Sequence, residues 1–215
     1  MQTTVLEKYS HISKINTKHN FLSRIVLSVL LLLITPQIFG TANLDAKTAA
    51  VPLEMFVSLI GIILLTPIFL PEQQEEIKEV IEVRTTNMNS IYIVRIVIAL
   101  LSMLVLVTGF VIYMKTNGCE FDLSILVFGT FAEGLFLGVI GLFSYGLSNN
   151  IAIGYMLPTI YFLLNMFSES KYFGKFYLFS MSKGSFGEKY WLFGFGIILL
   201  AIALFVKQKI CKYIR

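Results

Sequence analysis

Charged residues are scarce in this chain. Only 14% of its 215 residues are Asp, Glu, Lys or Arg, against about 25% in ordinary soluble proteins. Hydrophobic residues make up 56% of the sequence, and the mean hydropathy is +0.79. Since one membrane-crossing helix takes about 20 apolar residues, this composition can supply about six of them. It excludes a soluble globule and a disordered chain, and it predicts an integral membrane protein.

Cysteine and histidine are almost absent as well. The two cysteines, Cys119 and Cys211, are predicted on opposite faces of the bilayer, too far apart for a disulfide. His11 and His19 precede the first apolar run without a companion metal ligand. The sequence has no G-x-x-x-x-G-K-[ST] phosphate-binding loop and no G-x-S-x-G nucleophile motif. We therefore expect no metal, no cofactor and no catalytic residue on this chain.

Six apolar runs predict an all-α, polytopic membrane protein that forms a single transmembrane domain over residues 1–215. The spans lie at about 24–40, 51–70, 91–114, 121–147, 151–167 and 190–206. Residues 121–167 are too long for one crossing, and Ser148-Asn149-Asn150 provides turn chemistry inside them, so we expect a tight hairpin of two helices there. Gly40-Thr41-Ala42 has the pattern of a signal-peptide cleavage site. An uncleaved first span is favoured because its preceding segment is long for a signal peptide and five more spans follow.

The placement of lysine and arginine indicates the orientation of the chain. These residues lie between the apolar runs and do not gather on a soluble face, which argues against nucleic-acid binding. With the N-terminus inside, most of the 17 Lys and Arg residues fall on the cytoplasmic side, as the positive-inside rule requires. We expect a multi-pass protein of a bacterial cell membrane with both termini in the cytoplasm.

Two stretches outside the spans have the character of the membrane–water interface. Residues 1–20 alternate apolar and basic side chains at helical spacing, the pattern of an amphipathic interfacial helix; a frayed start of the chain is the alternative. Residues 168–189 are rich in aromatic side chains and lysine, which suits a segment dipping into the outer boundary of the bilayer.

An acidic helix is predicted at residues 71–86, between the second and third spans. Pro71 suits the first position of a helix, and the acidic residues after it suit the positive end of the helix dipole. The acidic residues are Glu72, Glu75, Glu76, Glu79 and Glu82, and the opposite face carries Ile77, Val80, Ile81 and Arg84. A short helix needs a surface for its apolar stripe. That surface is either the protein's own bundle or a cytoplasmic partner.

Three ionisable residues lie in or beside the predicted spans. Glu133 is near the middle of the fourth span, where exposure to lipid costs at least about 2.5 kcal/mol, so it must face protein, face water or be protonated. A structural hydrogen bond and a role in a transport pathway are both open. Arg95 lies early in the third span and either reaches the cytoplasmic face or approaches Glu133. Glu54 begins the second span, and we expect it at the interface.

The fourth span also carries a stripe of small residues. Gly134 and Gly138 form a small-x-x-x-small pattern, which Gly141 extends. Such a pattern lets two helices approach closely. It predicts tight packing within the bundle and, more weakly, a dimer face.

The order of these elements resembles that of the permease subunits of type-2 ABC exporters, over nearly the whole chain. In that family a glutamate-rich coupling helix follows the second span, then come small polar residues and a basic residue entering the third span. The matching residues here are the five glutamates at 72–82, then Thr85-Thr86 and Arg95, although the glycine usual in that segment is missing. Residues 168–189 match the position of the family's re-entrant segment.

The resemblance implies a function and partners. It implies export of an amphipathic substrate (lipid, peptide or drug-like) by alternating access, driven by a separate ATPase subunit that binds ATP and Mg²⁺ and docks on residues 72–84. One six-span chain would be half a pore, so a homodimer or a related second permease is expected. The alternatives are a non-transporting immunity or sensor protein that binds a peptide at the outer face, and an intramembrane enzyme of unrecognised type.

Overall fold

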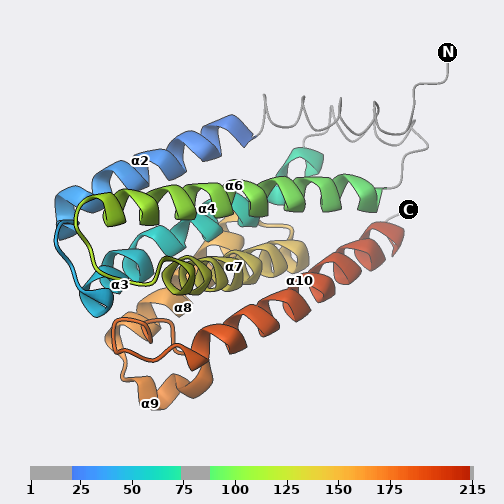
Figure 1. Cartoon of the computed structure of the whole chain (residues 1–215). Coiled ribbons are helices and arrows are strands. Elements are labelled where there is room, and N and C mark those ends of the chain that lie inside the picture. The colour runs from blue at the N-terminus through green and yellow to red at the C-terminus, as the bar shows by residue number, and fades with distance from the viewer. Residues whose placement is uncertain (1–20, 74–87, 214–215) are drawn as a thin grey trace.

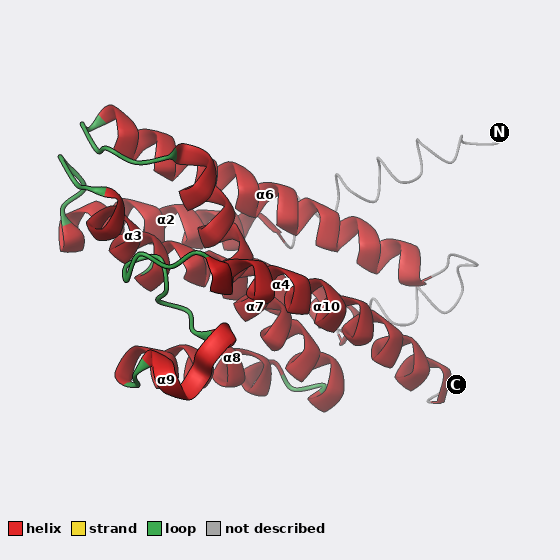
Figure 2. Cartoon of the chain, turned by 60° about the horizontal axis from the view of Figure 1, so that its bottom comes forward, coloured by secondary structure: helices red, strands yellow, loops and turns green. Residues whose placement is uncertain are grey.

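The computed structural model describes residues 21–73 and 88–213. Within these ranges the regular secondary structure is entirely helical (Figures 1 and 2). The elements are α2 (Leu22–Phe39), α3 (Ala46–Met55), η2 (Val57–Leu59), α4 (Ile60–Leu65), η3 (Thr66–Gln73), α6 (Met88–Thr116), α7 (Leu123–Ser148), α8 (Ile151–Phe167), α9 (Ser170–Phe173), η4 (Gly174–Phe176) and α10 (Gly187–Tyr213). The prediction of an all-α fold is confirmed for these residues. The predicted amphipathic helix at 1–20 lies outside them.

Five stretches among the described residues are long and apolar enough to cross a membrane. They are Leu22–Phe39, Ala46–Leu70, Ile91–Thr116, Leu123–Ser148 and Gly187–Lys207. The helix α8 is apolar but shorter, with 17 residues. This is the composition of a polytopic membrane protein, as the sequence predicts.

The long helices run between two ends of the molecule (Figure 1). At the end that we call proximal, α7 turns into α8, η3 stops at Gln73, and α10 terminates. At the opposite, distal end lie the α2–α3 and α6–α7 connections and the distal segment, which we define as residues 168–186. Backbone hydrogen bonds from Asn43 N to Asn117 O and from Glu120 N to Leu44 O join the two distal connections at 3.1 and 3.0 Å.

Helix α7 is the central element of the bundle. It packs on α4, α6, α8 and α10, and most of its residues are buried. In contrast, α2 buries only Ser28 and Thr35 among its described side chains, and their hydroxyls donate to the carbonyls of Arg24 and Leu31 in the same helix. The outer faces of α2, α6, α8 and α10 expose large apolar side chains. Such faces are suited to contact with lipid and not with water.

The second predicted span is one continuous crossing in length but not one continuous helix. It is divided into α3, η2, α4 and η3. Pro67 has non-helical backbone angles (φ −88°, ψ 22°) at the last of these breaks. Because proline lacks the N–H that would bond to the carbonyl four residues earlier, the helix is interrupted at this point.

The turn between α7 and α8 lies at Ser148-Asn149-Asn150, where the sequence predicts it. Asn149 adopts the left-handed conformation (φ 50°) that asparagine tolerates better than most residues. The side chain of Asn150 accepts a hydrogen bond from Ala152 N at 2.9 Å and so caps α8. Lys207 Nζ donates to Asn149 Oδ1 at 2.7 Å, which ties the end of α10 to this turn.

The glycine stripe of α7 faces other helices of the same chain. A Cβ added at Gly61 in α4 would lie 1.8 Å from the carbonyl oxygen of Gly134, and one added at Gly138 would lie 2.3 Å from the carbonyl oxygen of Gly61. A Cβ at Gly141 would meet Thr66 Oγ1 at 2.1 Å and the Gly154 carbonyl at 2.9 Å. Helices α4 and α7 are therefore in backbone-to-backbone contact, which only glycine permits.

This contact makes a testable prediction. We expect Gly61→Ala to destabilise the protein by about 1–3 kcal/mol or more, because the added methyl group meets backbone, which cannot move aside as a side chain can. The matched control is Gly109→Ala in α6, where an added Cβ meets nothing within 4 Å. Thermal unfolding of the detergent-purified protein measures both. Equal melting temperatures for the two variants would contradict the close packing.

Candidate functional site

A lysine is fully buried at the distal end of the bundle. Lys189, the third residue of α10, is 1% exposed. Its Nζ lies 2.9 Å from Glu54 Oε1 of α3, and it also donates to Glu133 Oε2 of α7 and to the carbonyl oxygen of Leu178. An ammonium group has three N–H donors, and here each has an acceptor. We call Lys189, Glu54 and Glu133 the ion cluster.

The ion cluster joins three helices that are far apart in the chain. Glu54 comes from the end of α3, Glu133 from the middle of α7, and Lys189 from the first turn of α10. Glu54 and Glu133 are both completely buried. In such surroundings an unpaired charge is very unfavourable, and removing one partner of a buried ion pair costs about 3–5 kcal/mol.

A glycine makes room for the buried lysine. A Cβ added at Gly129, one turn before Glu133, would lie 2.2 Å from Met181 Sδ and 3.5 Å from Lys189 Cγ. The missing side chain thus leaves the space that Met181 and the aliphatic stem of Lys189 occupy. Gly129 and Lys189 also line a pocket of about 180 Å³ together with Phe128 and Tyr190, so the stem of Lys189 borders an opening between α7 and α10.

The ion cluster also holds the distal segment in place. The Glu54 carboxylate accepts hydrogen bonds from the backbone N–H groups of Met181 at 2.7 Å and Ser182 at 3.0 Å. Leu178, whose carbonyl accepts from Lys189, donates its own N–H to Asn165 Oδ1 of α8 at 3.1 Å. The stretch 177–181 is buried beneath the helix ends as a result. Charge-assisted hydrogen bonds of this kind are stronger than neutral ones.

One oxygen of the ion cluster remains available. Glu133 Oε1 is buried and has no hydrogen-bond partner in the part of the chain that the structure describes. The same holds for Thr130 Oγ1, three residues earlier on α7. If both carboxylates are ionised, the ion cluster carries one net negative charge. The arrangement can therefore accept a proton or hydrogen-bond to a water molecule at Glu133.

The structure corrects the prediction for Glu54 and distinguishes between the alternatives left open for Arg95. Glu54, expected at the interface, is buried, because the distal segment folds over the end of α3 and brings Lys189 with it. Arg95 does not reach Glu133; its Nη1 donates to the carbonyl oxygen of Ile68 in η3 at 3.2 Å. Arg95 lies near the proximal end of α6, whereas Glu133 lies nearer the distal end of α7. Glu133 faces protein, which is one of the possibilities that its position in an apolar run leaves open.

Only one of the residues predicted to dock a partner lies in the part of the chain that the structure describes. Glu72 belongs to the last turn of η3. Glu75, Glu76, Ile77, Glu79, Val80, Ile81, Glu82 and Arg84 lie outside the described residues. Within residues 21–73 and 88–213, no group of three or more His, Cys, Asp or Glu side chains is arranged to hold a metal ion.

Comparison with known proteins adds no relative. No family model, no curated protein and no solved structure matches the chain.

The attachment of the distal segment can be tested through Glu54. We expect Glu54→Gln to raise amide hydrogen exchange at Met181 and Ser182 about 10- to 100-fold, because a neutral amide replaces the charged acceptor of both N–H groups. Exchange followed by mass spectrometry over residues 177–186 measures this. Glu120→Gln, an exposed carboxylate at the same end, is the control. Unchanged protection in Glu54→Gln would contradict the assignment.

Proposed function

We propose that this chain is the transmembrane subunit of a type-2 ABC exporter, driven by an ATPase on a separate chain. The observation that carries the proposal is the distribution of elements between the two ends. We call residues 71–86, the predicted acidic helix, the acidic segment. The chain enters and leaves it at the proximal end, where α10 also terminates, and the distal segment lies at the other end (Figure 1). This is the arrangement expected of a permease with a coupling helix on one side and a re-entrant segment on the other.

The number of crossings fits this proposal. The 17 residues of α8 extend over about 26 Å, close to the thickness of the hydrocarbon core of a bilayer, about 30 Å. With α8 counted as a crossing, the described residues cross six times, and α2 begins on the side where α10 ends. Although six lysines lie at the distal end, most of the 17 Lys and Arg residues of the whole sequence fall on the side of the N-terminus, which supports a cytoplasmic proximal end in a cell membrane.

The contacts around the acidic segment support a role in transmitting force. Ile68 of η3 and Arg95 of α6 are hydrogen-bonded, so the two elements that flank the acidic segment are tied together. Helix α4, which leads into η3, touches α7 backbone to backbone. Movement of the acidic segment by a partner would therefore displace η3 and α6 together and act on the central helix.

The mechanism that follows is a shift between two arrangements of the bundle. ATP binding, with Mg²⁺, closes a pair of ATPase subunits that press on the acidic segment. The helices then change their positions relative to a second permease subunit, either a second copy or a related chain, and open a path for an amphipathic substrate. The proposal assigns ATP hydrolysis to the partner and no catalysis to this chain.

Charge reversal tests the docking. We expect the triple change of Glu75, Glu76 and Glu79 to Lys to abolish co-purification with the ATPase subunit and to leave the permease folded, because it removes the acidic face without touching the apolar one. The ATPase is co-expressed with the tagged permease, and the complex is isolated in detergent.

The matched control reverses Asp45, Glu120 and Glu169, three exposed carboxylates of the distal end. This variant should retain the ATPase. If the first variant bound the ATPase as well as the unchanged chain does, residues 72–84 would not be the docking site. Substrate binding that is independent of ATP and of any ATPase would favour the immunity or sensor alternative.

A further inference from the structure

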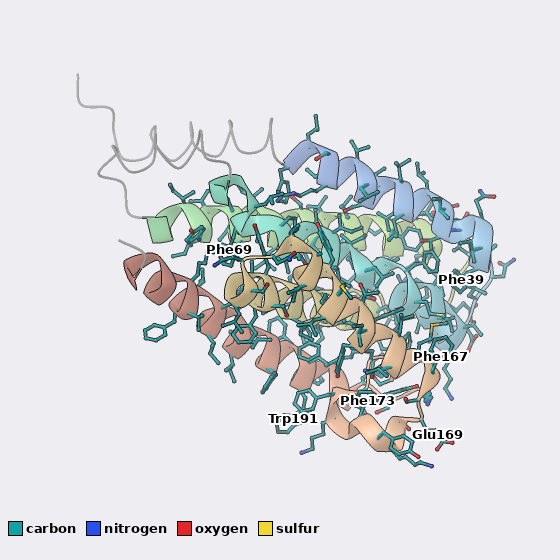
Figure 3. All side chains as sticks on the ribbon, turned by 180° about the vertical axis from the view of Figure 1, so that it is seen from behind. Phe39, Phe69, Phe167, Glu169, Phe173 and Trp191 are labelled. Carbon is teal, nitrogen blue, oxygen red and sulfur yellow. The ribbon has the colours of Figure 1, made fainter. Side chains whose placement is uncertain are left out.

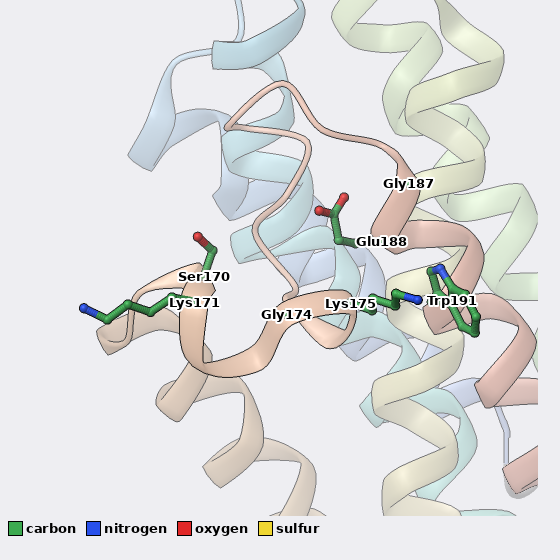
Figure 4. Close-up of a pocket in the computed structure, with 7 residues that line it drawn as sticks. All are labelled: Ser170, Lys171, Gly174, Lys175, Gly187, Glu188 and Trp191. Carbon is green, nitrogen blue, oxygen red and sulfur yellow. The ribbon is translucent and has the colours of Figure 1, made fainter.

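A pocket of about 480 Å³ lies at the distal end, between the distal segment and the start of α10 (Figure 4). One side is formed by Ser170, Lys171, Gly174 and Lys175, and the other by Gly187, Glu188 and Trp191. It is separate from the ion cluster, since none of the three cluster residues lines it. The proposed function makes no use of it.

The pocket presents opposite charges on its two sides. Lys175 Nζ lies 4.1 Å from the centroid of the Trp191 ring, a cation–π contact that directs the ammonium toward Trp191 (Figure 4). Glu188 lies on the α10 side, where one carboxylate oxygen accepts from Ser185 Oγ at 2.5 Å. The described ion pairs include neither Lys175 nor Glu188, whereas Lys171, which points away in Figure 4, pairs with Glu169 at 2.7 Å. Two lysines, Lys171 and Lys175, therefore border one side of the space and the carboxylate of Glu188 borders the other.

An exposed apolar stripe leads away from the pocket along α10. It consists of Trp191, Phe195, Ile198, Ile202 and Phe205, each between 44% and 58% exposed. Their spacing of four and three residues places them on one face of the helix, over a length of about 21 Å. This length exceeds one leaflet of the hydrocarbon core, about 15 Å. A charged pocket at the head of an apolar stripe matches the shape of a lipid.

The surroundings of the pocket are those of a membrane interface. Tyr172, Tyr190 and Phe167 are 73%, 67% and 81% exposed at the same end of the bundle as Trp191. Figure 3 shows Phe167, Phe173 and Glu169 near one another, with Trp191 beyond Phe173. Aromatic side chains of this kind gather at the level of lipid headgroups.

We propose that the pocket binds a phospholipid headgroup that carries both a phosphate and a primary ammonium, as phosphatidylethanolamine does. The phosphate lies at Lys175, the ammonium lies at Glu188, and an acyl chain follows the α10 stripe. A primary ammonium donates hydrogen bonds to a carboxylate, which the quaternary ammonium of phosphatidylcholine cannot do. The site requires only this chain and is independent of an ATPase.

The chain has a single tryptophan, Trp191, so intrinsic tryptophan fluorescence reports on this pocket alone. The purified chain is placed in phosphatidylcholine nanodiscs without any partner. Phosphatidylethanolamine, phosphatidylcholine or phosphatidylglycerol is then added with the same nitroxide quencher on the acyl chain near the headgroup. We expect phosphatidylethanolamine to quench Trp191 at about fivefold lower mole fraction than the other two lipids, the effect of one additional hydrogen bond between the primary ammonium and the Glu188 carboxylate.

Two variants separate the contributions of Glu188 and Lys175 to lipid binding. Glu188→Gln should reduce quenching by phosphatidylethanolamine to that by phosphatidylcholine, and Lys175→Gln should weaken quenching by both. Lys183→Gln is the matched control, because Lys183 also lies over an aromatic ring of the distal segment, that of Tyr177 at 4.3 Å, but does not line the pocket. It should behave as the unchanged chain does.

Four results would overturn the proposal. Three concern the lipids: equal quenching by all three lipids, stronger quenching by phosphatidylglycerol, and an unchanged lipid preference in Glu188→Gln. The fourth is relief of quenching by free phosphoethanolamine at concentrations as low as that of the phosphatidylethanolamine that causes it. The last would indicate a soluble ligand and not a lipid.

Discussion

The ammonium group of Lys189 is buried between two carboxylates and a carbonyl, and the distal half of the structure depends on it. All three of its protons are used, by Glu54, Glu133 and Leu178. The two helices that supply the carboxylates could not bury them without a cation, and the distal segment could not lie over α3 without the Glu54 carboxylate to accept its backbone N–H groups. One interaction therefore determines where α3, α7, α10 and residues 177–182 lie relative to one another.

The two ends of the bundle differ for this reason. At the distal end, ionic and backbone hydrogen bonds hold the helices and the distal segment together. At the proximal end, Arg95 joins α6 to η3, Lys207 joins α10 to the α7–α8 turn, and the ring of Phe69 packs on that of Tyr92. Between them, the glycine contact fixes α4 against α7. The Arg95–Ile68 hydrogen bond and the contact of α4 with α7 connect the two flanks of the acidic segment to the central helix, an arrangement that suits the proposed exporter function.

The sequence predicts the local features of this structure well. Apolar runs predict the long helices, residues 151–167 coincide with α8, and asparagine-rich turn chemistry predicts the α7–α8 turn. The burial of Glu133 follows from its place in an apolar run. Its partner does not, because Lys189 lies at the edge of its run and resembles an exposed loop lysine. The prediction of an interfacial Glu54 is wrong for a similar reason. The burial of Glu54 depends on the path of the distal segment, which the hydrophobic periodicity of the sequence does not indicate. The small-residue pattern predicts close packing, but the partner helix emerges only from the fold.

A double-mutant cycle between Glu133 and Lys189 tests the central claim most directly. Equilibrium unfolding in mixed micelles is measured for the unchanged chain, Glu133→Gln, Lys189→Met and the double variant. The account predicts that Lys189→Met destabilises by about 3–5 kcal/mol, and that the double variant is at least about 2 kcal/mol more stable than the sum of the single effects implies. Additivity within about 0.5 kcal/mol would mean that the two side chains do not interact, and it would contradict the account.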